Sequence, residues 1–151
     1  MSAENSENAM AAYIKKELQT RKAEEINELL LDNCKSKEFV GLEDAQKFTR
    51  LNHISAIGCE LESLKGLPTL PELTDVSQLV ESLPNLYHLN LCGNPLKTID
   101  QLKPLGKLSN LQALDVFDCP LTEAEGYRQE VFAAIPSLKF LDGFDFIMAS
   151  H

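Results

Sequence analysis

The stretch LYHLNLCGNPL, residues 86–96, most constrains how this chain can fold. Its leucines are spaced by three, two and five residues, with Asn94 between the last two. An amphipathic helix buries a side chain about every 3.6 residues, and a half-buried strand buries every second residue. Since neither period gives this spacing, the stretch predicts a very short strand followed by a turn.

The same spacing occurs four times. It is found in Ile26, Leu29, Leu31 and Cys34; Leu51, Ile54, Ala56, Cys59 and Leu61; Leu86, Leu89, Leu91, Asn94 and Leu96; and Leu111, Leu114, Val116, Cys119 and Leu121. This matches L-x-x-L-x-L-x-x-[NC]-x-L, the leucine-rich-repeat pattern. We therefore expect an α/β solenoid, in which each repeat gives one short strand and parallel strands stack into a sheet.

The Asn or Cys of each repeat lies where the chain leaves its strand. An amide there can satisfy backbone N–H and C=O groups of the loop, and a cysteine fills the same space as a small hydrophobe. We expect these structural roles for Cys34, Cys59, Asn94 and Cys119. The four cysteines form no C-x-x-C pair and the chain has no N-x-[ST] site, so a reducing compartment without disulfides is expected.

One interval between repeats is too long. Equivalent strand positions, Leu29, Ile54, Leu89, Leu114 and Leu141, are separated by 25, 35, 25 and 27 residues. The long step carries a helical pattern of Val76, Leu79, Val80 and Leu83, with Thr74 or Asp75 as N-cap. We interpret it as one enlarged coil, so that the strand at Leu89 pairs directly with that at Ile54. The alternative is that segment 64–86 is unpaired and loosely held.

Both ends of a solenoid need a lid over the exposed core. Ile14 and Leu18 share one face of a helix predicted in AAYIKKELQTR, which would cover the first strand. At the other end, the second lid is expected from Tyr127, Val131, Phe132 and Ile135 at helical spacing, followed by Leu138 and Leu141. The predicted organisation is a disordered N-terminus at 1–10, a capped repeat domain at 11–146 and a tail at 147–151.

The charge balance limits the partners. Asp and Glu number 23 against 14 Lys and Arg, which gives a net charge of −9 among 151 residues. This charge repels nucleic acid and anionic membranes and attracts basic proteins, although it could also serve solubility alone. The chain has no apolar run of 18 residues, and its start, MSAENSENAM, does not resemble a secretion signal. We expect an intracellular protein without membrane association.

Several stretches resemble the acidic leucine-rich nuclear phosphoprotein 32 family. They are LDN at 31–33, LPNLYHLNLCGNPL, LDVFDC at 114–119 and above all YRQEVFAAIPSLKFLDGFD at 127–145. The resemblance implies a curved solenoid with a concave parallel sheet, no catalysis, and roles in histone binding, inhibition of histone acetylation and inhibition of protein phosphatase 2A. It covers the repeat domain without the acidic tract that follows it in the family, and one repeat strand is lacking.

Side chains on either side of the inward leucines are expected on the concave face, because neighbours in a strand alternate. Apolar residues there would anchor a basic partner, and acids would steer it. The predicted binding residues are Asp32, His53, Ile57, His88, Asn90, Asp115, Phe117, Asp118, Asp142 and Phe144. The alternative is that these residues only tile the sheet and that the aromatic rings pack on each other.

The sequence gives little support for an enzyme. It contains no G-x-S-x-G, G-x-x-x-x-G-K-[ST], H-E-x-x-H or G-x-G-x-x-G motif. His53 and His88 occupy equivalent positions, so a metal could bridge them near Cys92 if their strands pair. Two solvated imidazoles are the ordinary alternative, and we expect neither a metal nor a cofactor.

The leading hypothesis is a non-enzymatic, protein-binding regulator whose concave face binds histones or other basic proteins, with protein phosphatase 2A as a further target. A monomer in the nucleus and cytoplasm, without direct nucleic-acid binding, is expected. The alternative is a structural subunit that grips a partner's helix in a ribonucleoprotein, similar to the spliceosomal A-prime protein. A protein held next to RNA would show a basic edge, and no Lys/Arg cluster here exceeds a pair.

Overall fold

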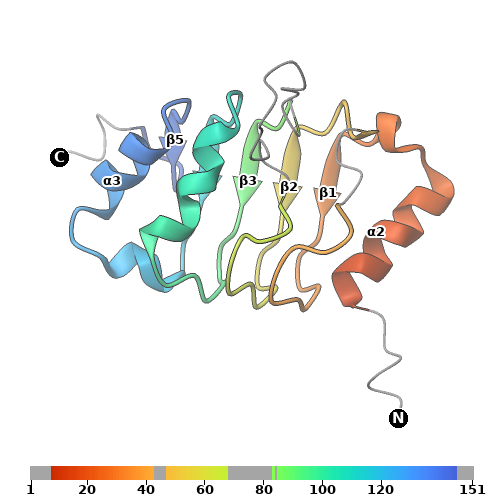
Figure 1. Ribbon diagram of the computed structural model, residues 1–151, viewed down its shortest axis with the longest axis horizontal. Coiled ribbons are helices and arrows are strands. Elements are labelled where there is room, and N and C mark those ends of the chain that lie inside the picture. The colour runs from red at the N-terminus through yellow and green to blue at the C-terminus, as the bar shows by residue number, and fades with distance from the viewer. Residues whose placement is uncertain (1–7, 43–46, 68–82, 84, 146–151) are drawn as a thin grey trace, which may run out of the picture.

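The computed structural model describes residues 8–42, 47–67, 83 and 85–145. A five-stranded parallel sheet runs in chain order, with helix α2 (Ala9–Thr20) at one end and α3 (Tyr127–Ala134) at the other (Figure 1). The strands are β1 (Glu28–Leu30), β2 (His53–Ser55), β3 (His88–Asn90), β4 (Ala113–Asp115) and β5 (Phe140–Leu141). The leucine-rich-repeat solenoid predicted from the leucine spacing is confirmed.

The strands pair in register through the first inward residue of each repeat. The paired and fully buried positions are Leu29, Ile54, Leu89, Leu114 and Leu141. β3 pairs directly with β2, which confirms the prediction that the strand at Leu89 lies next to the strand at Ile54 despite the 35-residue step. The helix expected around 76–83 lies outside the described residues except for Leu83, which is buried.

The return path after β3 is a 3₁₀ helix, η4 (Ile99–Lys107). Such a helix has three residues per turn, so side chains three apart point the same way, and Ile99, Leu102 and Leu105 are accordingly buried. A capping box between Thr98 and Gln101 begins the helix. Among the described residues, shorter 3₁₀ helices include η1 (Ala23–Glu25) and η5 (Pro120–Glu123).

The N-terminal lid uses the first half of its helix. Asn8 caps α2 by accepting hydrogen bonds from the amides of Met10 and Ala11, at 2.9 and 3.1 Å. Met10 and Ile14 are buried, whereas Leu18 is 41% exposed. The prediction that Leu18 packs on the core is therefore wrong, because Met10 supplies the second contact. The helix also begins two residues before the expected boundary at residue 11.

The C-terminal lid matches the residues expected to form it. Tyr127, Val131 and Ile135 are buried, and Phe132 packs against the same core while remaining partly exposed. Leu138 and Leu141 then enter the last coil. Within the described ranges, no helix is both long and apolar enough to cross a bilayer.

The Asn and Cys positions of the repeats lie side by side beneath the loops. Asn94 accepts hydrogen bonds from the amides of Cys59 and Leu61, each at 3.0 Å, and donates to the carbonyls of Ala56 and Leu91. The thiol of Cys59 donates to the Leu31 carbonyl. Cys119 repeats this bond two coils later, to Leu91, and Cys34 is partly buried at the first position. All four cysteines are free thiols.

Candidate protein-binding face

The outward positions of the strands form what we call the open face. It comprises three rows that cross the sheet: Glu28, His53, His88, Ala113 and Phe140; Leu30, Ser55, Asn90, Asp115 and Asp142; and Asp32, Ile57, Cys92, Phe117 and Phe144. Ser55 and Asp142 are buried, and the other members are at least partly exposed. The sheet thus presents a continuous surface of mixed acidic and apolar character.

The third row carries the two most exposed large apolar side chains of the open face, Phe117 and Phe144. Phe117 and Phe144 are each 53% exposed, and Ile57 is 37% exposed. The backbone beneath is fixed, because Ile57 and Phe117 each accept a hydrogen bond from a preceding coil, at 2.8 Å. The aromatic side chains therefore stand on a rigid support and face water, where nothing in the core requires them to be aromatic.

The two histidines of the first row stack on each other. Their ring centroids are 4.5 Å apart and their planes differ by 14°. His53 Nδ1 lies 3.5 Å from a Glu28 carboxylate oxygen, and His88 Nε2 lies 2.6 Å from an Asp115 carboxylate oxygen. Direct pairing of β2 and β3 brings the rings together, as the sequence predicted.

This stacking does not suit a bridging metal. Parallel rings do not direct their lone pairs at a common point, and His88 already shares its Nε2 with Asp115. Across the described part of the chain, no three His, Cys, Asp or Glu residues are grouped so as to hold a metal ion. Sequence reasoning missed the carboxylate partners: Asp115 hydrogen-bonds to His88, and Glu28 lies within ion-pair distance of His53.

The acidic side chains predicted for the open face differ in their exposure to solvent and in the hydrogen bonds that they already accept. Asp32 accepts hydrogen bonds from the Ser55 hydroxyl at 2.6 Å and the Ile57 amide at 2.9 Å, and it remains exposed. Asp118 is exposed in a turn with a φ of 61°, a left-handed conformation that aspartate tolerates. Asp115 is half-buried beside His88. These three acids border the apolar row.

Asp142 is the exception, because it is only 7% exposed. Its carboxylate accepts hydrogen bonds from the Val116 amide, at 2.8 Å, and from the Tyr127 hydroxyl, and it lies 4.0 Å from Arg128. Burial and this hydrogen bond raise the pKa of Tyr127 above its ordinary range. The prediction that Asp142 faces a partner is corrected: the chain turns left-handed at Asp142, with a φ of 55°, and the side chain points into the lid.

The C-terminal lid also positions Phe144. Arg128, on α3, donates from Nη2 to the Phe144 carbonyl at 3.0 Å, and the guanidinium lies over the Phe132 ring, 5.8 Å from its centroid. Backbone bonds between Leu141 and Phe144 close the turn, at 2.9 and 3.1 Å. The aromatic residue at the end of the row is thus held by the helix that covers the core.

Cys92 and Asn90 occupy the middle of the open face. The Asn90 side chain accepts a hydrogen bond from the Cys92 amide at 3.1 Å, so its oxygen serves its own turn. Burial raises the pKa of the Cys92 thiol to about 11. Cys92 is accordingly a neutral thiol at physiological pH and a poor nucleophile.

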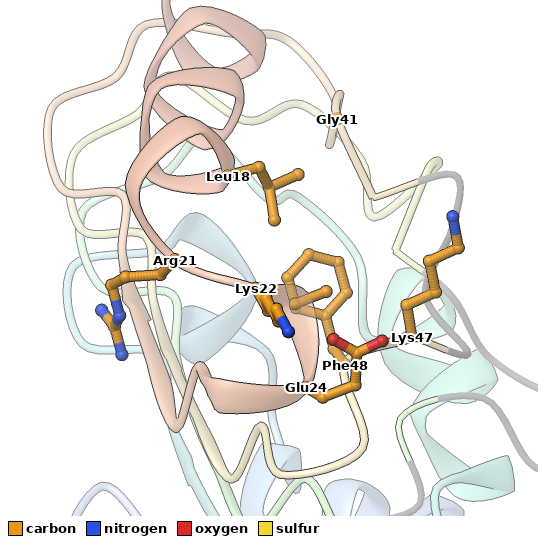
Figure 2. Close-up of a pocket in the computed structure, with 8 residues that line it drawn as sticks. Leu18, Arg21, Lys22, Glu24, Gly41, Lys47 and Phe48 are labelled. Atoms are coloured by element: carbon orange, nitrogen blue, oxygen red, sulfur yellow. The ribbon is translucent and has the colours of Figure 1, made fainter.

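Two surface hollows escaped sequence reasoning. One, of about 540 Å³, lies between α2 and Phe48, where Leu18 and Phe48 face an opening surrounded by Lys22, Glu24 and Lys47 (Figure 2). The other, of about 640 Å³, lies where β1, β2 and β3 begin. It is lined by Asn27, Arg50, Asn52, Asn85 and Tyr87. The residues of the first hollow have no periodic spacing that could reveal it in the sequence. In the second, Asn27, Asn52 and Tyr87 each lie two residues before the first inward residue of their repeat, a signal that sequence reasoning missed.

Solved structures with low sequence identity share this fold. A chain in the Drosophila melanogaster SNF/U2A' complex matches with a TM-score of 0.64 and 19% identity, over 82% of this chain and 63% of that one. The leucine-rich-repeat domain of Mex67 from Chaetomium thermophilum matches with a TM-score of 0.58 and 18% identity, over 90% of this chain and 93% of that one. These likenesses show the solenoid fold alone.

Sequence comparison is more specific. A leucine-rich-repeat family model matches residues 72–149. The acidic leucine-rich nuclear phosphoprotein 32 family member A proteins of Drosophila melanogaster and Drosophila pseudoobscura pseudoobscura are each 40% identical over 146 residues, covering 90% of this chain. The chain spans 55% of the length of each relative. With its repeats and its C-terminal lid, the chain belongs to the acidic leucine-rich nuclear phosphoprotein 32 family of leucine-rich-repeat proteins.

Proposed function

We propose that this chain is a non-enzymatic regulator that binds basic proteins on its open face. The proposed partners are histones. The protein would act as a histone chaperone, or as an inhibitor of histone acetylation or of protein phosphatase 2A. The observation that carries the proposal is the row of Ile57, Phe117 and Phe144, exposed beside Asp32, Asp115 and Asp118. The names of the relatives support a nuclear location, and we propose nucleus and cytoplasm.

The chemistry of this row fits a basic partner with apolar side chains. Aromatic residues on a rigid support lose little conformational freedom on binding and dominate the energy of most interfaces. Neighbouring acids add orientation and a faster encounter with a positively charged chain. The net charge of −9 acts in the same direction over a longer range.

Catalysis is a poorer use of the same residues. Asp32 and Asp118 are exposed on the open face and Asp115 is partly exposed, so water can reach these carboxylates and favours their ordinary ionised form. Cys92 is protonated because its pKa is about 11, so it lacks the thiolate that a cysteine enzyme needs. We therefore propose binding as a monomer, with no cofactor.

The test is the affinity of the protein for core histones, measured with the unmodified chain and with Phe117→Asp. We expect the substitution to weaken binding at least about tenfold, because it places a charge where an apolar anchor would be desolvated. Leu18→Asp is the matched control, since Leu18 is also an exposed apolar residue but lies on α2, away from the open face.

Equal and negligible affinity of the unmodified chain and Phe117→Asp for histones would remove the proposal. Equal weakening by Leu18→Asp would show that net charge, and not the open face, controls binding. The ribonucleoprotein alternative makes a different prediction. RNA that co-purifies with the protein and remains bound at high salt would favour that alternative.

A further inference from the structure

The edge of the sheet where the strands begin differs in chemistry from the edge where they end. The three available acids, Asp32, Asp115 and Asp118, lie within or after their strands. The opposite edge carries the cleft lined by Asn27, Arg50, Asn52, Asn85 and Tyr87, with a volume of about 640 Å³. Apart from one arginine its lining is neutral and rich in hydrogen-bond donors, in a chain whose net charge is −9.

Backbone hydrogen bonds place these residues next to one another. The Asn52 amide donates to the Asn27 carbonyl, and the Tyr87 amide donates to the Asn52 carbonyl, each at 2.8 Å. The three side chains therefore come from adjacent coils at one edge of the sheet. Asn85 is fixed beside them by a bond from its side-chain amide to the Thr49 carbonyl, at 2.5 Å.

Most donors in the cleft are unused. In the described part of the chain, the side chains of Asn27, Arg50 and Asn52 make no ion pair or hydrogen bond within the protein, and the Tyr87 hydroxyl makes none either. Glu28 is the nearest acid in sequence to the cleft, and it is turned toward His53, at 3.5 Å. The cleft thus offers a guanidinium, two amide groups and a phenol to an anionic group with several acceptor oxygens.

We propose that the partner of the open face is a basic polypeptide that also carries a phosphorylated serine or threonine, and that the phosphate binds in the Arg50 cleft. The inference rests on the proposed function, because the same polypeptide places its basic and apolar side chains on the open face. A phosphate has three acceptor oxygens and close to two negative charges, which match a forked guanidinium surrounded by neutral donors. A carboxylate, with two oxygens and one charge, would accept hydrogen bonds from fewer of these donors.

The geometry also sets the spacing on the partner. Asn27 and Asp32 lie five residues apart in one coil, on either side of β1, so the chain between them spans at most roughly 16 Å. An extended partner that runs along the strands would therefore separate its phosphate from its basic side chain by about five residues. This predicts a short linear motif in which phosphorylation strengthens the binding of a basic segment to an acidic protein.

The test uses fluorescent decapeptides with an arginine, a phenylalanine and a phosphoserine five residues from the arginine, in both chain orders, and matched peptides with serine or glutamate. We expect at least one phosphoserine peptide to bind about fivefold more tightly than its serine counterpart. Arg50→Gln should remove that gain and leave the serine peptide unchanged. Lys97→Gln, which removes an exposed charge outside the cleft, should preserve the gain.

The outcomes separate this inference from the proposed function. If phosphoserine brings no gain, or if the gain survives Arg50→Gln, the phosphate site is wrong, whereas weaker serine-peptide binding by Phe117→Asp would still support the open face. If Phe117→Asp binds all peptides as well as the unmodified chain does, the proposed function fails. An equal gain from glutamate would contradict phosphate recognition, and a complete lack of peptide binding would overturn both.

Discussion

The two ends of the solenoid close the core in different ways. At the N-terminal end, α2 buries Met10 and Ile14, and none of its residues belongs to the open face. At the C-terminal end, α3 buries Tyr127 but also connects, through Tyr127 and Arg128, to Asp142 and Phe144. The first lid therefore only completes the core, whereas the second also positions a binding residue. Damage to the first should affect stability alone, and damage to the second should affect stability and binding.

The largest effect is expected from Asp142→Ala in the C-terminal lid. The substitution leaves the Val116 amide and the Tyr127 hydroxyl without their acceptor and places alanine at a φ of 55°. We expect a loss of about 4 kcal/mol in the free energy of unfolding, measured by urea denaturation. Histone affinity should also fall at temperatures where the variant is still folded, because the last turn no longer holds Phe144.

Asp32→Ala is the matched control for that variant. Asp32 also accepts a backbone amide of a neighbouring coil, from Ile57, but it is exposed to water. Its loss should cost only about 1 kcal/mol in the free energy of unfolding. Equal destabilisation by the two substitutions would contradict the special role assigned to the buried carboxylate.

The N-terminal lid is tested by Ile14→Ala. Ile14 is 1% exposed, so truncation should leave a cavity and reduce the free energy of unfolding by about 3 kcal/mol. Affinity for histones should stay within about twofold of the unmodified chain under conditions where the variant is folded. A large loss of affinity in the folded variant would show that the two lids do not divide their roles as described.

Tyr127→Phe should reduce the free energy of unfolding by only about 1 kcal/mol near neutral pH, because it removes one hydrogen bond to Asp142. Its pH dependence is more informative. Burial and the bond to Asp142 raise the pKa of Tyr127 in the folded state above the ordinary value of 10.0. Its stabilisation should therefore be complete below pH 10 and decline as the pH rises further, because the unfolded chain loses its proton first.

Denaturation curves measured at several pH values would test this sign. Above pH 10, the unmodified chain should lose stability more steeply than Tyr127→Phe, which cannot titrate at this position. Parallel pH profiles would show that the Tyr127 hydroxyl is not held in its protonated form by the lid.

The regular part of the fold could be predicted because the leucine spacing of each repeat indicates which of its residues are buried. The equivalent strand positions, of which Leu29 is the first and Leu141 the last, correctly predicted the strand register. The 35-residue interval correctly predicted that β2 pairs directly with β3. The prediction was wrong in the N-terminal helix, where a different apolar side chain packs on the core. Met10, four residues before Ile14, makes the second buried contact of α2 that was expected from Leu18, four residues after Ile14, and a helical pattern alone cannot distinguish the two.

The site could be predicted only in part, for a related reason. Alternation along a strand correctly exposes Phe117 and Phe144, but it fails at Asp142, where β5 ends and the backbone becomes left-handed. The Arg50 cleft was missed although Asn27, Asn52 and Tyr87 occupy equivalent repeat positions, because the sequence prediction considered the inward residues and their outward neighbours but not the residues before each strand. The repeat register indicates which exposed groups are neighbours, but it does not show which of them already have a hydrogen-bond partner.

The most direct test of the central claim uses Cys92, which lies in the row between Ile57 and Phe117 on the open face. Its pKa of about 11 makes alkylation slow, so the rate should be measured by mass spectrometry near about pH 9, with and without saturating core histones. Cys34, beneath the loops of the first coil, is the internal reference. We predict that bound histones slow alkylation of Cys92 at least about fivefold and change the rate at Cys34 less than about twofold. Unchanged alkylation of Cys92 while histones are bound would contradict binding on the open face.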